Sequence, residues 1–193
     1  MRELTYLIAV SLDGYIAAPD DAFDAFLTEG DHVDHLFAEW SDTLPAAALT
    51  AAGAAADNKH FDTVVMGWQT YAVGFPFGVT DPYPHLRSYV VTHRPEREVP
   101  GDPGGVTLTG EDPVALVRRL KQEDGSGIWL CGGSRLAATL ADEIDRLVLK
   151  VHPILLGEGK PLFAQRPYAR TAFALAETRS FTTGVLMNTY VRR

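Results

Sequence analysis

Short apolar runs that end at glycine and lead into helical patterns recur along this chain, and they constrain its fold more than any other feature. Phe61 to Gly67 is one such run, and Gly127 to Cys131 is another, which continues into Gly132-Gly133-Ser134. Runs of this length and composition are typical of buried strands. Three further short apolar runs are also predicted as strands, although they do not end at glycine: Glu3 to Val10, Arg87 to Thr92 and Ile144 to Val151.

Helical patterns separate these strands. From Asp31 onward, apolar residues recur at helical spacing on one face that consists of Val33, Leu36, Phe37 and Trp40. Pro45 is placed to begin a second helix through the alanine-rich stretch to about Ala56. Later in the chain, Asp112-Pro113 supplies an N-cap and a first-turn proline. The helix that follows directs Leu116, Val117 and Leu120 inward, and Ser134 to Ala141 forms a short last helix.

The end of the chain has a different pattern. Thr171 to Arg179 and Gly184 to Val191 are predicted as two strands joined across Ser180 to Thr183, which is a hairpin. Long loops are expected at Gly74 to Pro84 and Pro95 to Gly105, where proline and glycine are dense. The expected fold is therefore an α/β sheet, mostly parallel, covered by helices on both faces, with an antiparallel edge.

Composition limits what such a chain does. With 193 residues, 46% of them hydrophobic, residues 1–193 are expected to form one globular domain. No stretch reaches the roughly 18 to 20 apolar residues of a membrane span, and a single cysteine excludes an internal disulfide. We expect a cytoplasmic protein. The net charge of −8 argues against nucleic-acid binding, and twelve acids against two bases in residues 1–62 leave the later part better suited to anions.

Candidate ligand-binding residues follow three of the strands, and one of these strand ends is Val64 to Gly67, which leads into Trp68 to Tyr71. Gly132-Gly133 lets a backbone approach a diphosphate, although an ordinary tight turn has the same sequence. The G-x-G-x-x-G and P-loop patterns are both absent. Thr92-His93-Arg94 offers a hydroxyl, an imidazole and a guanidinium to a terminal phosphate, or else is a surface arginine before a proline-rich loop.

Five blocks in register carry a resemblance to a known superfamily. They are Val10-Ser-Leu-Asp-Gly-Tyr-Ile-Ala17, Val-Met-Gly-x-x-Thr-Tyr at 65–71, Thr-His-Arg at 92–94, Trp129-Leu-Cys-Gly-Gly-Ser134, and Lys150-Val-His-Pro-Ile-Leu-Leu-Gly-Glu-Gly-Lys-Pro-Leu-Phe163. Over residues 3 to 191 the chain resembles the dihydrofolate reductase superfamily. Within it, the chain is most similar to the reductase domain of riboflavin-biosynthesis enzymes and its stand-alone relatives. The resemblance implies a three-layer αβα fold with an eight-stranded mixed sheet, NADPH as hydride donor, and a homodimer.

The resemblance also implies positions for the cofactor. Gly132, Gly133, Ser134 and Arg135 would hold the diphosphate, with a cis peptide between the two glycines. Gly67, Trp68, Gln69 and Thr70 would cap a second helix onto the cofactor, and Thr92, His93 and Arg94 would meet the 2′-phosphate. Ser11 to Ala17 would form a loop over the nicotinamide, with Ile16 near the ring. The candidates for substrate contact are Ser11, Asp13 and His152.

Two departures from the family pattern limit the function. Trp68 stands where relatives place an arginine that also reaches the 2′-phosphate, so the preference for NADPH would rest on His93 and Arg94. Dihydrofolate reductases have a carboxylate on the first helix that binds the pterin, but no acid here aligns with it. The acids considered are Asp31, Asp34, Glu39 and Asp42. Folate reduction is therefore disfavoured.

The sequence gives weaker indications of other kinds of site. His32 and His35 are spaced for a divalent metal, but exposed helix-face histidines are commoner. Lys150 and His152 share one face of a strand, where a substrate contact and a structural role both stay open. Cys131 has no neighbour that marks it as an activated thiolate. No catalytic acid or base and no metal site are assigned.

The resulting hypothesis is an NADPH-dependent reductase of a small pyrimidine-like, pterin-like or carbonyl substrate. The first substrate that the resemblance suggests is an aminopyrimidine with a ribosyl phosphate, as for a 5-amino-6-(5-phosphoribosylamino)uracil reductase. One alternative is an NADP-binding sensor or ligand-binding protein without turnover. Another is a metal-dependent hydrolase built on the His32 and His35 pair.

Overall fold

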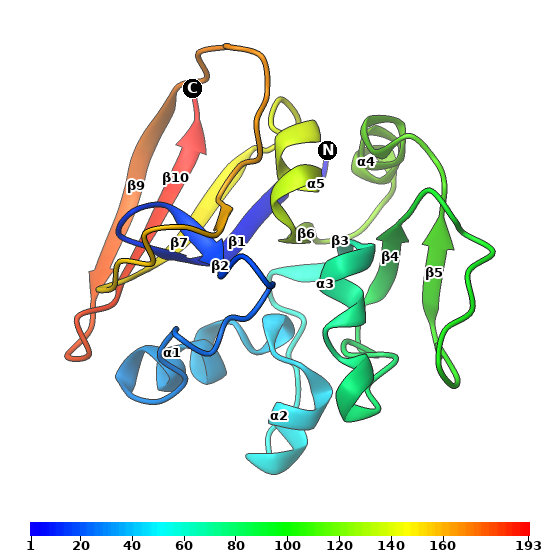
Figure 1. Cartoon of the computed structure of the whole chain (residues 1–193), viewed down its shortest axis with the longest axis horizontal. Helices are drawn as coiled ribbons and strands as arrows, with labels where there is room; N and C mark the ends of the chain where they lie inside the picture. The colour runs from blue at the N-terminus through cyan, green and yellow to red at the C-terminus, as the bar shows by residue number, and fades with distance from the viewer.

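The computed structural model describes residues 1–193, and its centre is a sheet of eight strands in the order β5-β4-β3-β6-β1-β7-β10-β9 (Figure 1). The strands are β1 (Leu4–Ser11), β3 (Phe61–Gly67), β4 (Arg87–Val91), β5 (Val106–Thr109), β6 (Gly127–Gly132), β7 (Arg146–His152), β9 (Phe173–Ser180) and β10 (Leu186–Arg192). A second small sheet pairs β2 (Tyr15–Ala17) with β8 (Lys160–Pro161).

The strand directions match the expected mixed sheet. The pairs formed among β1, β3, β4, β5, β6 and β7 are parallel. By contrast, β10 runs antiparallel to both β7 and β9. β1 lies between β6 and β7, with Leu4 opposite Ile128 and Thr5 opposite Arg146. The mostly parallel sheet with a C-terminal antiparallel hairpin is confirmed.

Helices cover both faces of the sheet (Figure 1). They are α1 (Asp31–Glu39), α2 (Ala46–Ala51), α3 (Trp68–Ala72), α4 (Pro113–Gln122) and α5 (Ser134–Thr139), with short 3-10 turns at Ser41–Thr43 and Phe75–Phe77. One core cluster packs α4 and α5 against Leu4 and Tyr6 of β1. The other packs Leu36 of α1 and Tyr71 of α3 against Leu7 and Trp129. Three layers, helix, sheet and helix, therefore surround two cores.

Helix α4 forms as its sequence predicts. The Asp112 carboxylate accepts a hydrogen bond of 2.9 Å from the backbone N–H of Ala115, and Pro113 occupies the first turn. Its apolar face is fully buried and consists of Leu116, Val117 and Leu120. Helix α4 therefore covers the face of the sheet opposite to the face that α1 covers.

Several sequence expectations were wrong in detail. Helix α2 ends at Ala51 and not near Ala56, because Gly53 turns the backbone to a φ of +64° two residues later. Strand β5, which directly follows the loop from Pro95 to Gly105, was not predicted. Strand β2 lies within the segment that was expected to be a loop. Both strands are short, and their patterns are too brief to be recognised without a partner strand.

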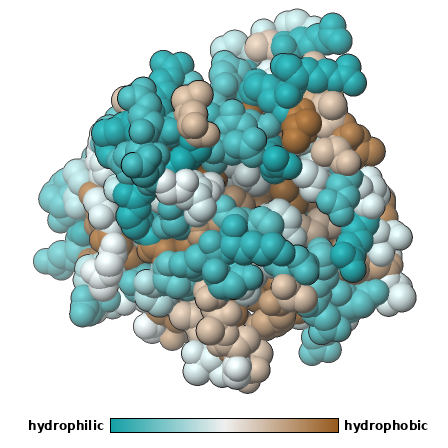
Figure 2. Space-filling model, turned by 180° about the vertical axis from the view of Figure 1, so that it is seen from behind, coloured by the Kyte–Doolittle hydropathy of each residue, from teal (hydrophilic) through white to brown (hydrophobic).

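Figure 2 shows the back of the molecule relative to Figure 1. This face is mainly polar, with hydrophobic areas between the polar side chains. Large apolar side chains that stay exposed come from separate segments: Phe77, Leu155 and Leu175 are 80%, 71% and 58% exposed. No helix of the structure combines the length and the apolar character needed to cross a membrane.

Candidate active site

The glycines that end β3 and β6 lie side by side at the carboxyl edge of the sheet. A side-chain carbon added at Gly67 would sit 3.8 Å from the backbone nitrogen of Gly133. The Gly132-Gly133 peptide is cis, as the resemblance implies, and Gly132 has a φ of +139°. Helices α3 and α5 each begin directly after these glycines. Two strand-to-helix turns therefore present bare backbone at one place.

Thr70 closes one side of this turn. A side-chain carbon added at Gly133 would come within 3.3 Å of the Thr70 hydroxyl oxygen, and one at Gly132 within 3.5 Å. The space above the turn thus accepts a ligand only because both positions lack side chains.

Ser134 supplies a polar group that the fold leaves without a partner. Its hydroxyl is buried and makes no hydrogen bond within the chain. A buried hydroxyl without a partner is unfavourable, and a phosphate oxygen at this turn would accept its hydrogen bond. Gln69 and Arg135 are exposed at the starts of the two helices. The residues at this edge fit a diphosphate in shape and in hydrogen bonding.

The residues after β4 lie at the same edge, two strands from β6. Thr92 is 9% exposed, and its hydroxyl oxygen accepts a hydrogen bond of 3.2 Å from the backbone N–H of Arg94. The side chains of His93 and Arg94 are exposed. The predicted phosphate cradle therefore has an anchored threonine and two side chains free to move.

Sequence reasoning missed Arg97. Its guanidinium lies over the indole of Trp68, with 4.2 Å from the guanidinium carbon to the ring centroid. Trp68 itself is held edge-on by Tyr71 and Phe75, with ring centroids 5.8 and 5.6 Å away. No pattern in the sequence links residues 68 and 97, because their contact joins the start of helix α3 to the loop after β4. A guanidinium therefore lies beside position 68, although it comes from another segment.

The segment expected to cover the nicotinamide is partly a strand, since β2 pairs with β8. Ile16 is half-buried in β2. The Ser11 hydroxyl donates a 2.5 Å hydrogen bond to the Asp13 carboxylate and accepts one of 2.9 Å from the Tyr15 N–H. These contacts hold the start of the segment in one conformation.

Asp13 fastens this segment to a distant loop. Its carboxylate accepts hydrogen bonds from the backbone N–H groups of Leu156, at 3.1 Å, and Gly157, at 2.7 Å. The bonds from Ser11 and from these backbone groups lower the pKa of Asp13. The carboxylate and the Ser11 hydroxyl, expected as substrate contacts, are therefore already engaged within the chain.

His152 and His32 form a buried pair on the α1 side of the sheet. They are 2% and 3% exposed, and their rings meet at right angles with centroids 5.5 Å apart. The Leu27 N–H donates to Nδ1 of His152 at 3.3 Å, and Nε2 of His32 lies 3.2 Å from the Leu27 carbonyl, to which it donates. The expectation that His32 is an exposed helix-face histidine was wrong, because its ring packs under the segment before α1.

Different contacts surround the two histidines. The Thr183 hydroxyl lies 3.1 Å from Nδ1 of His32 and donates a hydrogen bond of 3.5 Å to the Asp31 carboxylate. Burial, together with nearby Lys150 and His32, lowers the pKa of His152 to about 4. His35 packs instead on Phe181, and no group of three potential metal ligands forms in the structure.

The acids near α1 are paired within the chain or exposed. Asp31 accepts from the Thr182 N–H, Asp34 is exposed, and Glu39 pairs with Lys59 at 2.5 Å. Asp42 is buried, where it accepts from the backbone N–H groups of His60 and Phe61. Burial raises the pKa of the Cys131 thiol to about 11, so this residue is no activated nucleophile.

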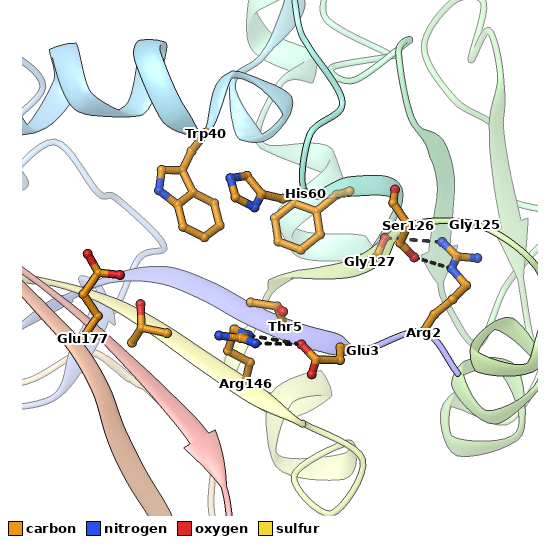
Figure 3. A pocket seen from close by; sticks show the side chains of 12 residues that line it. Arg2, Glu3, Thr5, Trp40, His60, Gly125, Ser126, Gly127, Arg146 and Glu177 are labelled. Atoms are coloured by element: carbon orange, nitrogen blue, oxygen red, sulfur yellow. Dashed lines mark hydrogen bonds and ion pairs between the residues drawn. The ribbon is translucent and has the colours of Figure 1, made fainter.

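A hollow of 440 Å³ lies at the other end of the strands from the glycine turns (Figure 3). Trp40 and His60 stack above it with ring centroids 4.0 Å apart, and the Arg146–Glu3 ion pair and Thr5 lie along the sheet. Trp40 directly follows α1, and the other residues start β1, β3 and β7 or lie close to those starts. None of the predicted cofactor residues lines this hollow, so it is separate from the candidate active site.

The eight-stranded mixed sheet and its adjacent glycine turns define a dihydrofolate reductase-like fold. The sequence profile of the RibD C-terminal domain matches residues 2–187. The chain belongs to this family.

Two relatives from Bacillus subtilis (strain 168) match nearly the whole chain. Uncharacterized protein YwjB is 33% identical over 196 residues, which cover 99% of this chain and 98% of the relative. Uncharacterized protein YyaP is 26% identical, with 98% of this chain and 94% of the relative covered.

Solved structures share the fold. A putative riboflavin biosynthesis protein from Shewanella sp. PV-4 has a TM-score of 0.75 at 24% identity, with 99% of both chains covered. A diaminohydroxyphosphoribosylaminopyrimidine deaminase/5-amino-6-(5-phosphoribosylamino)uracil reductase from Thermotoga maritima has a TM-score of 0.66 at 15% identity. That alignment covers all of this chain and 57% of the other protein. The riboflavin-type reductase fold predicted from the sequence is confirmed.

Proposed function

We propose that this chain binds NADPH at the paired glycine turns and reduces a small carbonyl or pyrimidine-type compound. The observation that carries the proposal is the bare backbone at Gly67 and Gly132-Gly133 beside the unpartnered Ser134 hydroxyl. Membership of the RibD C-terminal domain family supports it, as does the shared fold with a structure named as a 5-amino-6-(5-phosphoribosylamino)uracil reductase.

Each group of residues takes a separate part of the cofactor. Gly132, Gly133, Ser134 and Arg135 would hold the diphosphate, with Gly67 to Thr70 forming the other wall. Thr92, His93 and Arg94 would face the 2′-phosphate, and Ile16 would pack near the nicotinamide. The bound cofactor supplies a hydride, while the chain supplies orientation and keeps water from the reacting atoms.

A pterin is a poor candidate for the substrate. Its guanidine-like edge needs a carboxylate partner, and losing that partner costs roughly 1–3 kcal/mol for each unsatisfied buried donor. The four acids around α1 are engaged elsewhere or exposed. We therefore favour a substrate with carbonyl groups, such as an aminopyrimidine with a ribosyl phosphate.

Absorbance of NADPH, followed with a panel of acceptors, tests the proposal. The panel holds the aminopyrimidine ribosyl phosphate, small carbonyl compounds and dihydrofolate, and a parallel titration measures the NADPH affinity. We expect NADPH to raise the melting temperature of the protein by mass action. We also expect NADPH to be oxidised in the presence of the aminopyrimidine ribosyl phosphate or of a small carbonyl compound. Tight NADPH binding without oxidation by any acceptor would favour an NADP-binding sensor. Efficient dihydrofolate reduction would overturn the proposed substrate class.

We also propose that the protein is a homodimer and that it is located in the cytoplasm. Analytical ultracentrifugation would test the first proposal, and cell fractionation would test the second.

A further inference from the structure

The helix layer over the α1 face of the sheet is incomplete at one place. Leu7, Trp129 and Val148 on this face of β1, β6 and β7 are 2%, 4% and 0% exposed. Two residues further along each strand stand Ala9, Cys131 and Lys150, and all three are only half-buried. Central strands of a sheet are normally covered throughout. These three positions form an accessible area, which lies between Leu7 and Val148 on one side and Ser11 and His152, each 2% exposed, on the other.

This area borders the proposed cofactor site. Cys131 directly precedes Gly132-Gly133 on β6. Ala9 of β1 is in register with Lys150 of β7, so the lysine stands one strand from β1 and two from β6. Neighbouring strands are about 4.8 Å apart. A small molecule over Ala9 is thus within reach of both the glycine turn and the Lys150 side chain.

Lys150 differs from the other inward-facing basic residues of the chain. Lys121 bonds the Asp145 carboxylate at 2.6 Å and the Glu143 carbonyl at 2.6 Å, and Arg2 pairs with Asp62. The amino group of Lys150 makes neither an ion pair nor a hydrogen bond within the chain. Burial without a counter-ion lowers its pKa. The charged form of this amine has no acceptor within the chain, so an acceptor on a bound ligand would stabilise it.

The groups around Lys150 leave its charge uncompensated. On β6 the Cys131 thiol stays protonated at neutral pH, and on β7 His152 is neutral. On β10 Met187 stands opposite, and on α1 His32 bonds Leu27 and Thr183. The carboxylates of Asp31, Glu39 and Asp42 are bound elsewhere, as described above. With Lys150 protonated, the accessible area is therefore positive, although the chain as a whole carries −8.

We infer that the ammonium of Lys150 binds an electron-rich oxygen of the substrate, such as a ring carbonyl of a pyrimidinedione or a carboxylate. The same charge disfavours ligands that present an amidine or a protonated diaminopyrimidine ring. This inference rests on the proposed function, because it places the substrate beside the cofactor held at Gly132-Gly133. It assigns Lys150 as the residue that selects the substrate class.

Two pyrimidines of opposite charge test the inference. Orotate carries ring carbonyls and a carboxylate, whereas 2,4-diaminopyrimidine offers an amidine-like edge. Each is titrated calorimetrically into the protein with and without saturating NADPH. We expect orotate to bind the wild type more tightly than 2,4-diaminopyrimidine. Lys150→Met should weaken orotate about ten- to hundredfold, and Lys150→Arg should restore part of the loss.

The controls separate a binding role from a structural one. Lys59→Met removes an exposed lysine paired with Glu39 and should leave orotate binding unchanged. Lys150→Met should melt no lower than the wild type, since an unpaired buried charge contributes nothing favourable to the fold. NADPH affinity should stay within about twofold in both variants.

Three results would overturn the inference: orotate failing to bind, orotate binding equally to wild type and Lys150→Met, or 2,4-diaminopyrimidine binding better than orotate. Because NADPH affinity is measured separately, a wild type that fails to bind NADPH would overturn the proposed function instead. Orotate binding without the cofactor would then still report on Lys150.

Discussion

The guanidinium carbon of Arg97 lies 4.2 Å from the centroid of the Trp68 ring. An aromatic face attracts a cation and restricts its motion. Trp68 begins helix α3 beside the glycine turns, while Arg97 comes from the loop after β4. The pair therefore holds a positive charge where the strand-end residues are proposed to meet the 2′-phosphate of the cofactor.

Replacing Arg97 with alanine should reduce the selectivity for NADPH. A charge-assisted contact to phosphate contributes roughly 1.5–3 kcal/mol, which corresponds to about one to two powers of ten in affinity. NADH lacks this phosphate and should bind almost as before. Arg94→Ala should also weaken NADPH, but less than Arg97→Ala, because the Arg94 side chain is exposed and held by no aromatic ring. Calorimetric titration with both cofactors gives the ratio of the NADPH affinity to the NADH affinity. An unchanged ratio in Arg97→Ala, or a wild type without preference, would contradict the assignment.

A branched side chain at Gly133 should abolish cofactor binding. Even a single added carbon lies 3.3 Å from the Thr70 hydroxyl, so valine must project into the space above the turn. We expect Gly133→Val to fold and to lose measurable NADPH affinity. Gly105→Ala is the matched control, since its added carbon meets only the Asp81 carboxylate at 3.9 Å. Far-ultraviolet circular dichroism and NADPH titration check both variants, and unchanged affinity in Gly133→Val would remove the turn from the site.

Acid should destabilise the protein partly through His152. Its pKa is about 4 in the folded chain against an ordinary value of 6.5, so between these values the unfolded chain binds a proton that the folded chain does not. Stability due to this residue is complete above pH 6.5 and decreases as the pH falls toward 4. We expect a loss of about 2 kcal/mol over this range, since each pH unit changes the free energy by at most about 1.4 kcal/mol.

Urea unfolding at pH 7 and pH 4.5 measures this loss. His152→Gln removes the titrating ring and should show a smaller decrease between the two pH values than the wild type. His93→Gln, at an exposed position, should behave as the wild type. Equal decreases in all three proteins would show that His152 does not contribute.

Removing the Asp13 carboxylate should release the loop at residues 155–158. The backbone N–H groups of Leu156 and Gly157 donate to Asp13 and have no other acceptor in the fold. In Asp13→Ala these two amides should exchange with deuterium faster, while amides of β1 keep their protection. Asp20→Ala, which removes an exposed acid nearby in the sequence, is the control. Unchanged exchange at both amides would mean that the loop is held by other contacts.

Local patterns predicted most of the sheet and its helices because the strands are apolar and each glycine or proline marks a boundary. Phe61–Gly67 and the capped helix after Asp112 are examples. The contacts that define the site are different, since they join segments far apart in the sequence. Arg97 reaches Trp68, and His32 packs on His152, only after the strands have been ordered in the sheet. No spacing along the chain reports such pairs, so the sequence led to an exposed His32 where the fold buries it.

The central position of β1 has a consequence for biosynthesis. Leu4–Ser11 leaves the ribosome early, yet it pairs with β6 and β7, which belong to about the last third of the chain. During translation this apolar strand therefore has neither of its neighbours, and it depends on protection by other means until they arrive. A pause in synthesis before residue 127 should prolong that interval, and a nascent chain arrested there is expected to bind chaperones that recognise extended apolar segments.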